Sequence, residues 1–202
     1  MILKSDRMAA MLGSPDQTDP LVITPCPNLE ELRKKGSASV DLRLGSWFAE
    51  MRKSRASHLK MVGDTEGDDA RFLSKMHFIR FGDIFVLHPH QFILGITLEW
   101  IRFPRTYAGY VTSRSSWGRR GLVIATAVGV HPGFSGCLTL ELTNLGELPI
   151  KLSPGLAICQ LFIHQVSSDT DAVDRSAFVG QRKPVLGDVG PDSFAEKLRQ
   201  TI

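Results

Sequence analysis

The run G-C-L-T-L-E-L-T-N at residues 136–144 alternates apolar and polar side chains with a period of two. Successive side chains of a β-strand point to opposite faces of a sheet. Leu138, Leu140 and Leu142 therefore lie on one face of a predicted strand, and Glu141 lies on the other. If the leucines fill a hydrophobic core, the Glu141 carboxylate points away from it.

Short runs of the same kind recur along the chain, each bounded by glycine, proline or asparagine. With residues 136–144, they lie at residues 39–44, 84–88, 92–100, 107–113, 122–128, 148–152 and 156–164. About eight strands at this spacing predict an all-β domain, either a closed barrel or a jelly roll. Long helices do not alternate with these strands, which excludes a Rossmann fold and a TIM barrel.

Helices are predicted to be few and short. One signal begins with Ser5 as its N-cap, and another is capped by Asn28 and stopped by Gly36. The predicted helices cover residues 5–11, 28–35 and 194–200. The polar and charged stretch at residues 51–75 predicts a long exposed loop.

The composition is that of an ordinary globular protein. Of the 202 residues, 43% are hydrophobic and 22% are charged, which excludes wholesale disorder. The net charge of +3 is too small for a dedicated nucleic-acid binder. Three well-separated cysteines exclude a disulfide scaffold and a thiolate zinc site within one chain. Apolar runs are too short to cross a bilayer, and the N-terminus has no apolar signal segment. We therefore expect a cytoplasmic protein with neither membrane nor nucleic-acid partners.

The densest polar signal is S-R-S-S-W-G-R-R-G at residues 113–121, between two predicted strands. Arginines and hydroxyls this close together suit a polyphosphate, which is bound by a bidentate guanidinium fork and short neutral donors. The alternative interpretation is a solvated basic turn. The chain has neither G-x-x-x-x-G-K-[ST] nor G-x-G-x-x-G, so a P-loop and a dinucleotide fingerprint are excluded.

Two further segments place single polar residues in apolar strands. H-P-G-F-S-G at residues 131–136 leads into the strand that holds Glu141. A lone acid on a strand is a general-base candidate only when its face lines a pocket, and otherwise it is solvated. L-S-P-G-L-A-I-C-Q-L at residues 152–161 holds Gln160, which is either a satisfied core amide or a ligand-binding one.

These three segments, in this order, closely resemble the dCTP deaminase family of the dUTPase superfamily. The matching patterns are S-R-S-S-x-x-R, P-G-[FW]-S-G-x-[LI]-x-L-E and P-G-x-x-I-x-Q-L. Further family landmarks are similar at residues 1–7, 39–45, 87–99 and 178–182. The resemblance implies a homotrimer of distorted jelly-roll subunits with a few short helices and active sites between neighbours. It also implies hydrolytic deamination of dCTP to dUTP and ammonia, which supplies dUTP for dUMP and dTTP synthesis.

The resemblance implies a catalytic role for three residues. Glu141 corresponds to the glutamate that takes a proton from the water attacking C4 of cytosine. Ser115 and Arg119 correspond to the serine and arginine that place this water and stabilise the developing charge. Zinc is not expected, because zinc deaminases need H-x-E and P-C-x-x-C motifs and this chain has neither.

The resemblance implies substrate contacts for a larger set of residues. Arg114, Ser116 and Gln160 correspond to triphosphate-facing positions. The backbone at Thr126 and Ala127 corresponds to the stretch that reads the pyrimidine, and Gly133 and Phe134 correspond to the turn under the deoxyribose. Phe178, Gly180 and Gln181 correspond to a C-terminal lid that closes over the nucleotide. The lid segment is alternatively a mobile tail. Mg²⁺ is expected to accompany the triphosphate, without protein metal ligands, and dTTP is a candidate inhibitor.

Two positions depart from the family pattern. His131 stands where an aspartate is usual, next to the sugar 3′-hydroxyl, and Phe178 stands where a tyrosine is common. A histidine does not supply the carboxylate that activates water for attack on phosphate in the dUTPase branch, so dUTP hydrolysis is not expected. The alternatives are a bifunctional enzyme that releases dUMP, and a catalytically silent nucleotide-binding regulator. The retained Ser115, Arg119 and Glu141 argue against the silent alternative.

We therefore expect a single dCTP deaminase-like domain over residues 1–202. Its parts are an N-terminal helical segment at residues 1–38, a β core at residues 39–166, and a C-terminal lid and tail at residues 167–202.

Overall fold

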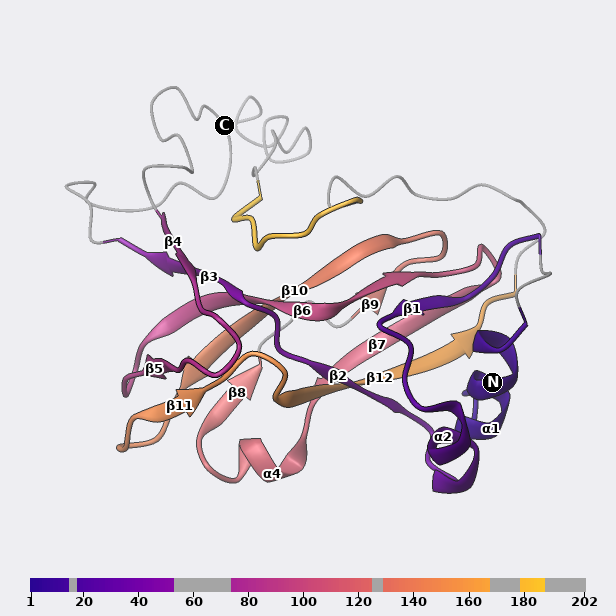
Figure 1. Cartoon of the computed structure of the whole chain (residues 1–202), viewed down its shortest axis with the longest axis horizontal. Helices are drawn as coiled ribbons and strands as arrows, with labels where there is room; N and C mark the ends of the chain where they lie inside the picture. Colours follow the sequence, from indigo (N-terminus) through magenta and orange to yellow (C-terminus); the bar gives the residue numbers. More distant parts are fainter. Residues whose placement is uncertain (15–17, 53–73, 125–128, 168–178, 188–202) are drawn as a thin grey trace, which may run out of the picture.

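Figure 1 shows the computed structural model of the chain, which describes residues 1–14, 18–52, 74–124, 129–167 and 179–187. Antiparallel strands dominate this part of the chain. The strands are β1 (Val22–Thr24), β2 (Val40–Arg43), β3 (Trp47–Met51), β4 (Ser74–Phe78), β5 (Phe85–Leu87), β6 (Phe92–Arg102), β7 (Tyr107–Ser113), β8 (Leu122–Ile124), β9 (Gly129–Val130), β10 (Ser135–Asn144), β11 (Ile150–Leu152) and β12 (Ala157–Gln165). The helices are α1 (Ser5–Leu12), α2 (Leu29–Lys35) and α4 (Ser115–Gly118). None of the helices in these ranges is long and apolar enough to cross a membrane.

The strands form two main sheets. In the described residues, the larger sheet has the order β4-β3-β6-β10-β8, and β1 also pairs with β6. The second sheet has the order β2-β12-β7-β9, and β5 pairs separately with β11. In Figure 1, β6 and β10 run above β2, β7 and β12, and the helices α1 and α2 lie together at one end. This architecture confirms the predicted all-β fold with few short helices.

One hydrophobic core joins the two sheets. Leu42 of β2 and Leu161 of β12 enter it from one sheet, and Ile93 of β6 and Leu140 of β10 enter it from the other. All four side chains are fully buried, and burying each contributes about 1.5–3 kcal/mol. Buried and half-buried residues alternate along all of β10. The prediction that the leucines of this strand face the core and Glu141 faces away is confirmed.

A bulge interrupts the pairing of β6 with β10. Cys137 pairs with Trp100 and Thr139 pairs with Ile96, so residues 97–99 lie opposite a single residue of β10. The Thr97 hydroxyl replaces the missing ladder contact by accepting a hydrogen bond of 2.9 Å from the backbone N–H of Leu138. Bulges of this kind bend a strand and redirect its side chains.

The helix predictions hold at one helix and need a correction at another. Asn28 caps α2 by accepting hydrogen bonds from the N–H groups of Glu30 and Glu31, and Gly36 ends the helix in the left-handed conformation, as predicted. The assignment of Ser5 as the N-cap of α1 is wrong. Lys4 occupies that position, while the buried Ser5 hydroxyl has no hydrogen-bond partner in the described structure.

The predicted strands are present, although several are shorter than their apolar runs. Four strands were not predicted, namely β1, β3, β4 and β9. The sequences of β3 and β4 show no clear alternation. They are strands because they pair with each other and because β3 also pairs with β6. Met51 and Ser74 therefore belong to strands, which makes the predicted loop at residues 51–75 too long at both ends. Residues 53–73 and the predicted helix at 194–200 lie outside the described residues.

Candidate active site

A cavity of about 460 Å³ lies beside the polar face of β10. Four residues that the sequence singled out line it together: His131, Phe134, Glu141 and Gln181. Leu94, Leu138 and Thr139 also contribute to its wall. The sequence prediction for Glu141 depended on whether its strand face lines a pocket, and the structure answers that it does.

The Glu141 carboxylate is half-buried in this cavity. Its position follows from the alternation of β10, in which Glu141 pairs with Leu94 of β6 and projects opposite to Leu140 and Leu142. In the described part of the chain, no cation pairs with it. Burial raises the pKa of the Glu141 carboxyl above its ordinary value. A carboxylate of raised pKa is suited to accept and return protons.

The turn at residues 131–134 forms one wall of the cavity. The backbone N–H of Phe134 donates a hydrogen bond of 3.2 Å to the carbonyl of His131, and Gly133 between them has a φ of 74°. Only glycine adopts this conformation readily. Phe134 is buried, whereas His131 is exposed. The turn therefore presents an aromatic surface and an imidazole to any ligand beside Glu141.

The segment at residues 179–187, which we call the arm, is hydrogen-bonded to the start of β10, ahead of the residues of that strand that pair with β8. The N–H of Gly180 donates a hydrogen bond of 2.6 Å to the carbonyl of Ser135, and the N–H of Cys137 donates one of 2.9 Å to the carbonyl of Gln181. Close approach depends on Gly136, where an added Cβ would lie 3.3 Å from the backbone nitrogens of Gly180 and Gln181. The arm brings Gln181 from a distant part of the sequence to the cavity that Glu141 lines.

The remaining predicted residues form a second group, away from this cavity. Arg114 precedes the short helix α4, and Ser115, Ser116 and Arg119 are in or directly after it. The side chains of Ser115, Ser116 and Arg119 are exposed. Neither these four residues nor Gln160 lines the cavity of Glu141. A single chain therefore does not bring the predicted water-placing residues to the predicted base. Thr126, Ala127 and Phe178 lie outside the described residues.

Asp41 contacts two residues of the second group, Gln160 and Arg114, and was not predicted as a site residue. It lies on β2 directly opposite Gln160 of β12. Gln160 Nε2 donates a hydrogen bond of 3.2 Å to Asp41 Oδ1, Lys35 Nζ lies 2.8 Å from Oδ2, and Arg114 Nε lies 4.0 Å from Oδ1. Burial pushes the pKa of Asp41 upward, but the bonds from Lys35 and Gln160 and the charge of Arg114 outweigh it and lower the pKa. Two sequence signals pointed to it: an acid on the outward face of the run at residues 39–44, and the family landmark at residues 39–45.

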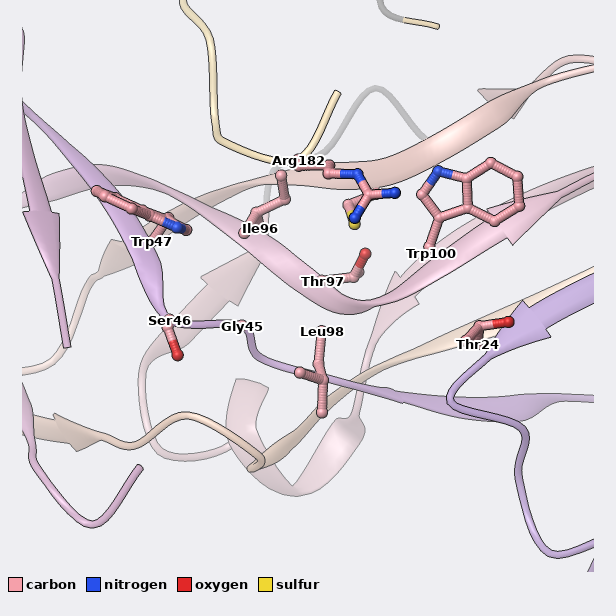
Figure 2. Close-up of a pocket in the computed structure, with 10 residues that line it drawn as sticks. Thr24, Gly45, Ser46, Trp47, Ile96, Thr97, Leu98, Trp100 and Arg182 are labelled. Atoms are coloured by element: carbon pink, nitrogen blue, oxygen red, sulfur yellow. The ribbon is translucent and has the colours of Figure 1, made fainter. Parts of the chain in front are cut away.

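A second cavity, of about 490 Å³, lies across the arm over β6 (Figure 2). In Figure 2 the guanidinium of Arg182 lies between the side chains of Trp47 and Trp100, above Thr97. Lys183 Nζ lies 4.2 Å from the centre of the Trp47 ring, a cation–π contact. None of the sequence-predicted site residues lines this cavity. Consecutive arm residues, Gln181 and Arg182, thus reach two different cavities.

The described residues hold no group of three or more His, Cys, Asp or Glu side chains that could bind a metal ion. Within these ranges, a protein-held metal therefore has no ready set of ligands.

Comparison with known proteins shows the family to which the chain is similar. Residues 15–166 match the model of the dCTP deaminase-like family. The chain is 39% identical over 153 residues to a "dCTP deaminase, dUMP-forming" of Parafrankia sp., covering 73% of this chain and 74% of that one. It is 38% identical over 152 residues to a dCTP deaminase of Natronomonas pharaonis, covering 73% and 76%.

A solved structure has a similar fold. The crystal structure of 2′-deoxycytidine 5′-triphosphate deaminase from Agrobacterium tumefaciens superposes with a TM-score of 0.59 at 20% identity, covering 82% of this chain and 46% of that one. The family model matches most of the chain. The two relatives, at 39% and 38% identity, are matched over about three quarters of their length. The chain belongs to the dCTP deaminase family.

Proposed function

We propose that the protein catalyses the hydrolytic deamination of dCTP to dUTP and ammonia. The observation that carries this proposal is the half-buried Glu141 carboxylate, which has a raised pKa and lines a cavity with His131, Phe134 and Gln181. Family membership supports it, as do relatives named dCTP deaminase.

The reaction exchanges the amine on C4 of cytosine for oxygen. The oxygen of water bonds to C4, one water proton ends on ring nitrogen N3, the other ends on the amine, and the C4–N4 bond breaks to release ammonia. Glu141 accepts the proton of the attacking water and returns protons to nitrogen. Burial suits it to this task, because a general base works best when its pKa is close to the working pH.

Water placement is assigned to Ser115 and Arg119. Since neither residue lines the cavity of Glu141 in its own chain, we propose that a neighbouring copy supplies them, in a homotrimer. The serine hydroxyl then hydrogen-bonds the water, and the guanidinium stabilises negative charge developing on the tetrahedral carbon's oxygen. This division of the site explains why a single chain holds two separate groups of candidate residues.

The substrate contacts divide in the same way. Phe134 and Gly133 lie under the deoxyribose, with His131 at its 3′-hydroxyl, the backbone at residues 126–127 reads the pyrimidine, and the arm covers the nucleotide through Gly180 and Gln181. Phe178 belongs to the same lid. Arg114, Ser116 and Gln160 bind the triphosphate.

Magnesium fits as a companion of the triphosphate. Mg²⁺ usually keeps several waters and binds phosphate oxygens with few protein ligands, and the described residues hold no cluster of three metal-binding side chains. When bound, the ion neutralises part of the phosphate charge. Arg114, Ser116 and Gln160 would hold the oxygens that carry it. We expect turnover without zinc, and competition by dTTP, which shares the sugar and triphosphate.

We propose dUTP as the released product. The turn beside Glu141 carries His131, which gives no carboxylate to activate a water at phosphate. The alternative is release of dUMP, favoured by the Parafrankia and Kocuria rhizophila relatives named as dUMP-forming enzymes, at 39% and 38% identity. A silent regulator is the second alternative, and measured turnover would exclude it.

The decisive assay incubates the protein with dCTP and Mg²⁺ and separates dCTP, dUTP and dUMP by chromatography. Glu141→Gln keeps the volume and a hydrogen bond but accepts no proton, so we expect turnover to fall by at least about 10²-fold while dCTP binding by calorimetry is retained. Near-normal turnover of this variant would remove Glu141 from the mechanism. Repeating the assay with a zinc chelator and excess Mg²⁺ tests zinc independence.

A further inference from the structure

The carboxylate of Asp41 lies where the proposed function disfavours a negative charge. It is among the side chains proposed to bind a triphosphate, and its pKa is lowered, so it is ionised at neutral pH. A negative charge there repels phosphate. The Asp41 carboxylate is compatible with phosphate binding if it favours binding in another way that offsets this repulsion.

The contacts of Asp41 indicate what it contributes. Arginine and glutamine have long side chains, and ordering them costs conformational entropy when a ligand binds. Asp41 Oδ1 accepts a hydrogen bond from Gln160 Nε2 at 3.2 Å and faces Arg114 Nε at 4.0 Å, while Lys35 at 2.8 Å holds Oδ2. The side chain of Asp41 is 24% exposed, against 36% for Arg114. A fixed acceptor thus restrains two otherwise flexible donors.

The particular atoms used support this interpretation. The guanidinium of Arg114 turns its Nε toward Asp41, and in the described residues its two terminal nitrogens have no acceptor. Those terminal nitrogens form the bidentate fork that suits phosphate. Gln160 spends one amide N–H on Asp41, which leaves its second N–H available. Asp41 therefore orients both side chains without occupying the groups that a phosphate would need.

We propose that Asp41 is a positioning residue, which orients Arg114 and Gln160 toward the triphosphate and acts through them rather than by touching the substrate. The proposal rests on the proposed function, because it requires these two side chains to bind the phosphates.

The test is a double-mutant cycle on nucleotide binding, carried out in the Glu141→Gln background so that no turnover occurs. Asp41→Asn keeps an oxygen for Gln160 but loses the charge that faces Arg114 and Lys35. We expect it to weaken dCTP binding roughly tenfold, the order of a lost charge-assisted contact, and to leave dCMP binding within about twofold. When Asp41→Asn is combined with Arg114→Ala, it should weaken dCTP binding little further, because the effects of substitutions at coupled residues do not add.

Two further variants keep the outcome clear. Asp41→Glu retains the charge but moves it by one methylene. A positioning role predicts that this variant binds dCTP more weakly, whereas a pure charge effect predicts no change in dCTP binding. Asp83→Asn makes the same charge change at an exposed turn and should bind like the parent. Tighter or unchanged dCTP binding by Asp41→Asn would overturn the proposal, as would additivity with Arg114→Ala or an equal loss of dCMP binding. If the parent binds neither nucleotide, the proposed function itself fails.

Discussion

The backbone N–H of Arg43 donates a hydrogen bond of 2.8 Å to Oε2 of Glu99, and so joins β2 of one sheet to β6 of the other. The Glu99 side chain is 2% exposed, and Arg43 Nη1 lies 3.5 Å from its Oε1. Burial raises the pKa of Glu99, and the bonds and charge of Arg43 offset only part of that effect. A buried acid at the bulge of β6 therefore couples the packing of the two sheets to pH.

Glu99→Gln should make stability less dependent on pH. Because the folded-state pKa of Glu99 lies above the ordinary value of 4.5, the folded protein binds this proton more tightly than the unfolded chain. The free energy of unfolding then falls as pH rises from 4.5 through the raised pKa. Glutamine still accepts the Arg43 bond but does not titrate. Calorimetric melting temperatures should decline less across that interval than in wild type.

The exposed Glu147 offers the control for this measurement. Glu147→Gln should follow the wild-type decline, and the same decline in Glu99→Gln would contradict the role of Glu99.

Gly136→Ala should loosen the arm. The glycine has a φ of 153°, and an added Cβ would lie 3.3 Å from the backbone nitrogens of Gly180 and Gln181. Strain of about 1–3 kcal/mol is expected at such a position, which corresponds to a rise of roughly tenfold in KM for dCTP. Trypsin should also cleave faster after the exposed Arg182. Wild-type rates of cleavage and an unchanged KM would show that the arm does not depend on this contact.

Mixing two inactive variants should restore activity if the site is shared between copies. Glu141→Gln and Arg119→Ala each remove one half of the proposed site. In randomly mixed trimers, about a quarter of the sites combine an intact glutamate from one copy with an intact arginine from its neighbour. Turnover should therefore return to about a quarter of wild type after the subunits are exchanged.

Light scattering provides the companion measurement, with an expected mass of about three times the 22.3 kDa of one chain. A monomer, or an exchanged mixture that remains inactive, would place the entire site within one copy.

Wild-type protein should release no dUMP from dUTP, whereas His131→Asp should gain some. His131 lines the cavity with Glu141, and a carboxylate in its place is ionised at neutral pH and ready to accept a proton from water. Chromatography of dUTP incubated with each protein and Mg²⁺ makes the comparison, and His131→Asn serves as the uncharged control. Steady dUMP formation by wild type would favour the dUMP-forming alternative.

The secondary structure was predictable wherever a strong local pattern decides it. Alternation identified β10 and the face of Glu141, and Asn28 with Gly36 identified α2, because side-chain period and capping depend on neighbouring residues. Ser5 resembled an N-cap, but the first residue of α1 is packed inside, with its N–H bonded to the carbonyl of Ser37. Tertiary contacts overrode the local signal there. The strands β3 and β4 were not predicted, because only their pairing with each other makes them strands.

By itself, the sequence determined where the candidate site residues lie along the chain: an acid on a leucine-backed strand, a turn with Gly133 and Phe134, and a basic segment around Arg114. Each of these is a property of a short stretch. Only the tertiary structure decided their grouping, with Glu141 beside Gln181 and Arg114 beside Asp41. These groupings depend on how β10 meets the arm and how β2 pairs with β12, and long-range pairing is set by burial of the shared core rather than by local sequence.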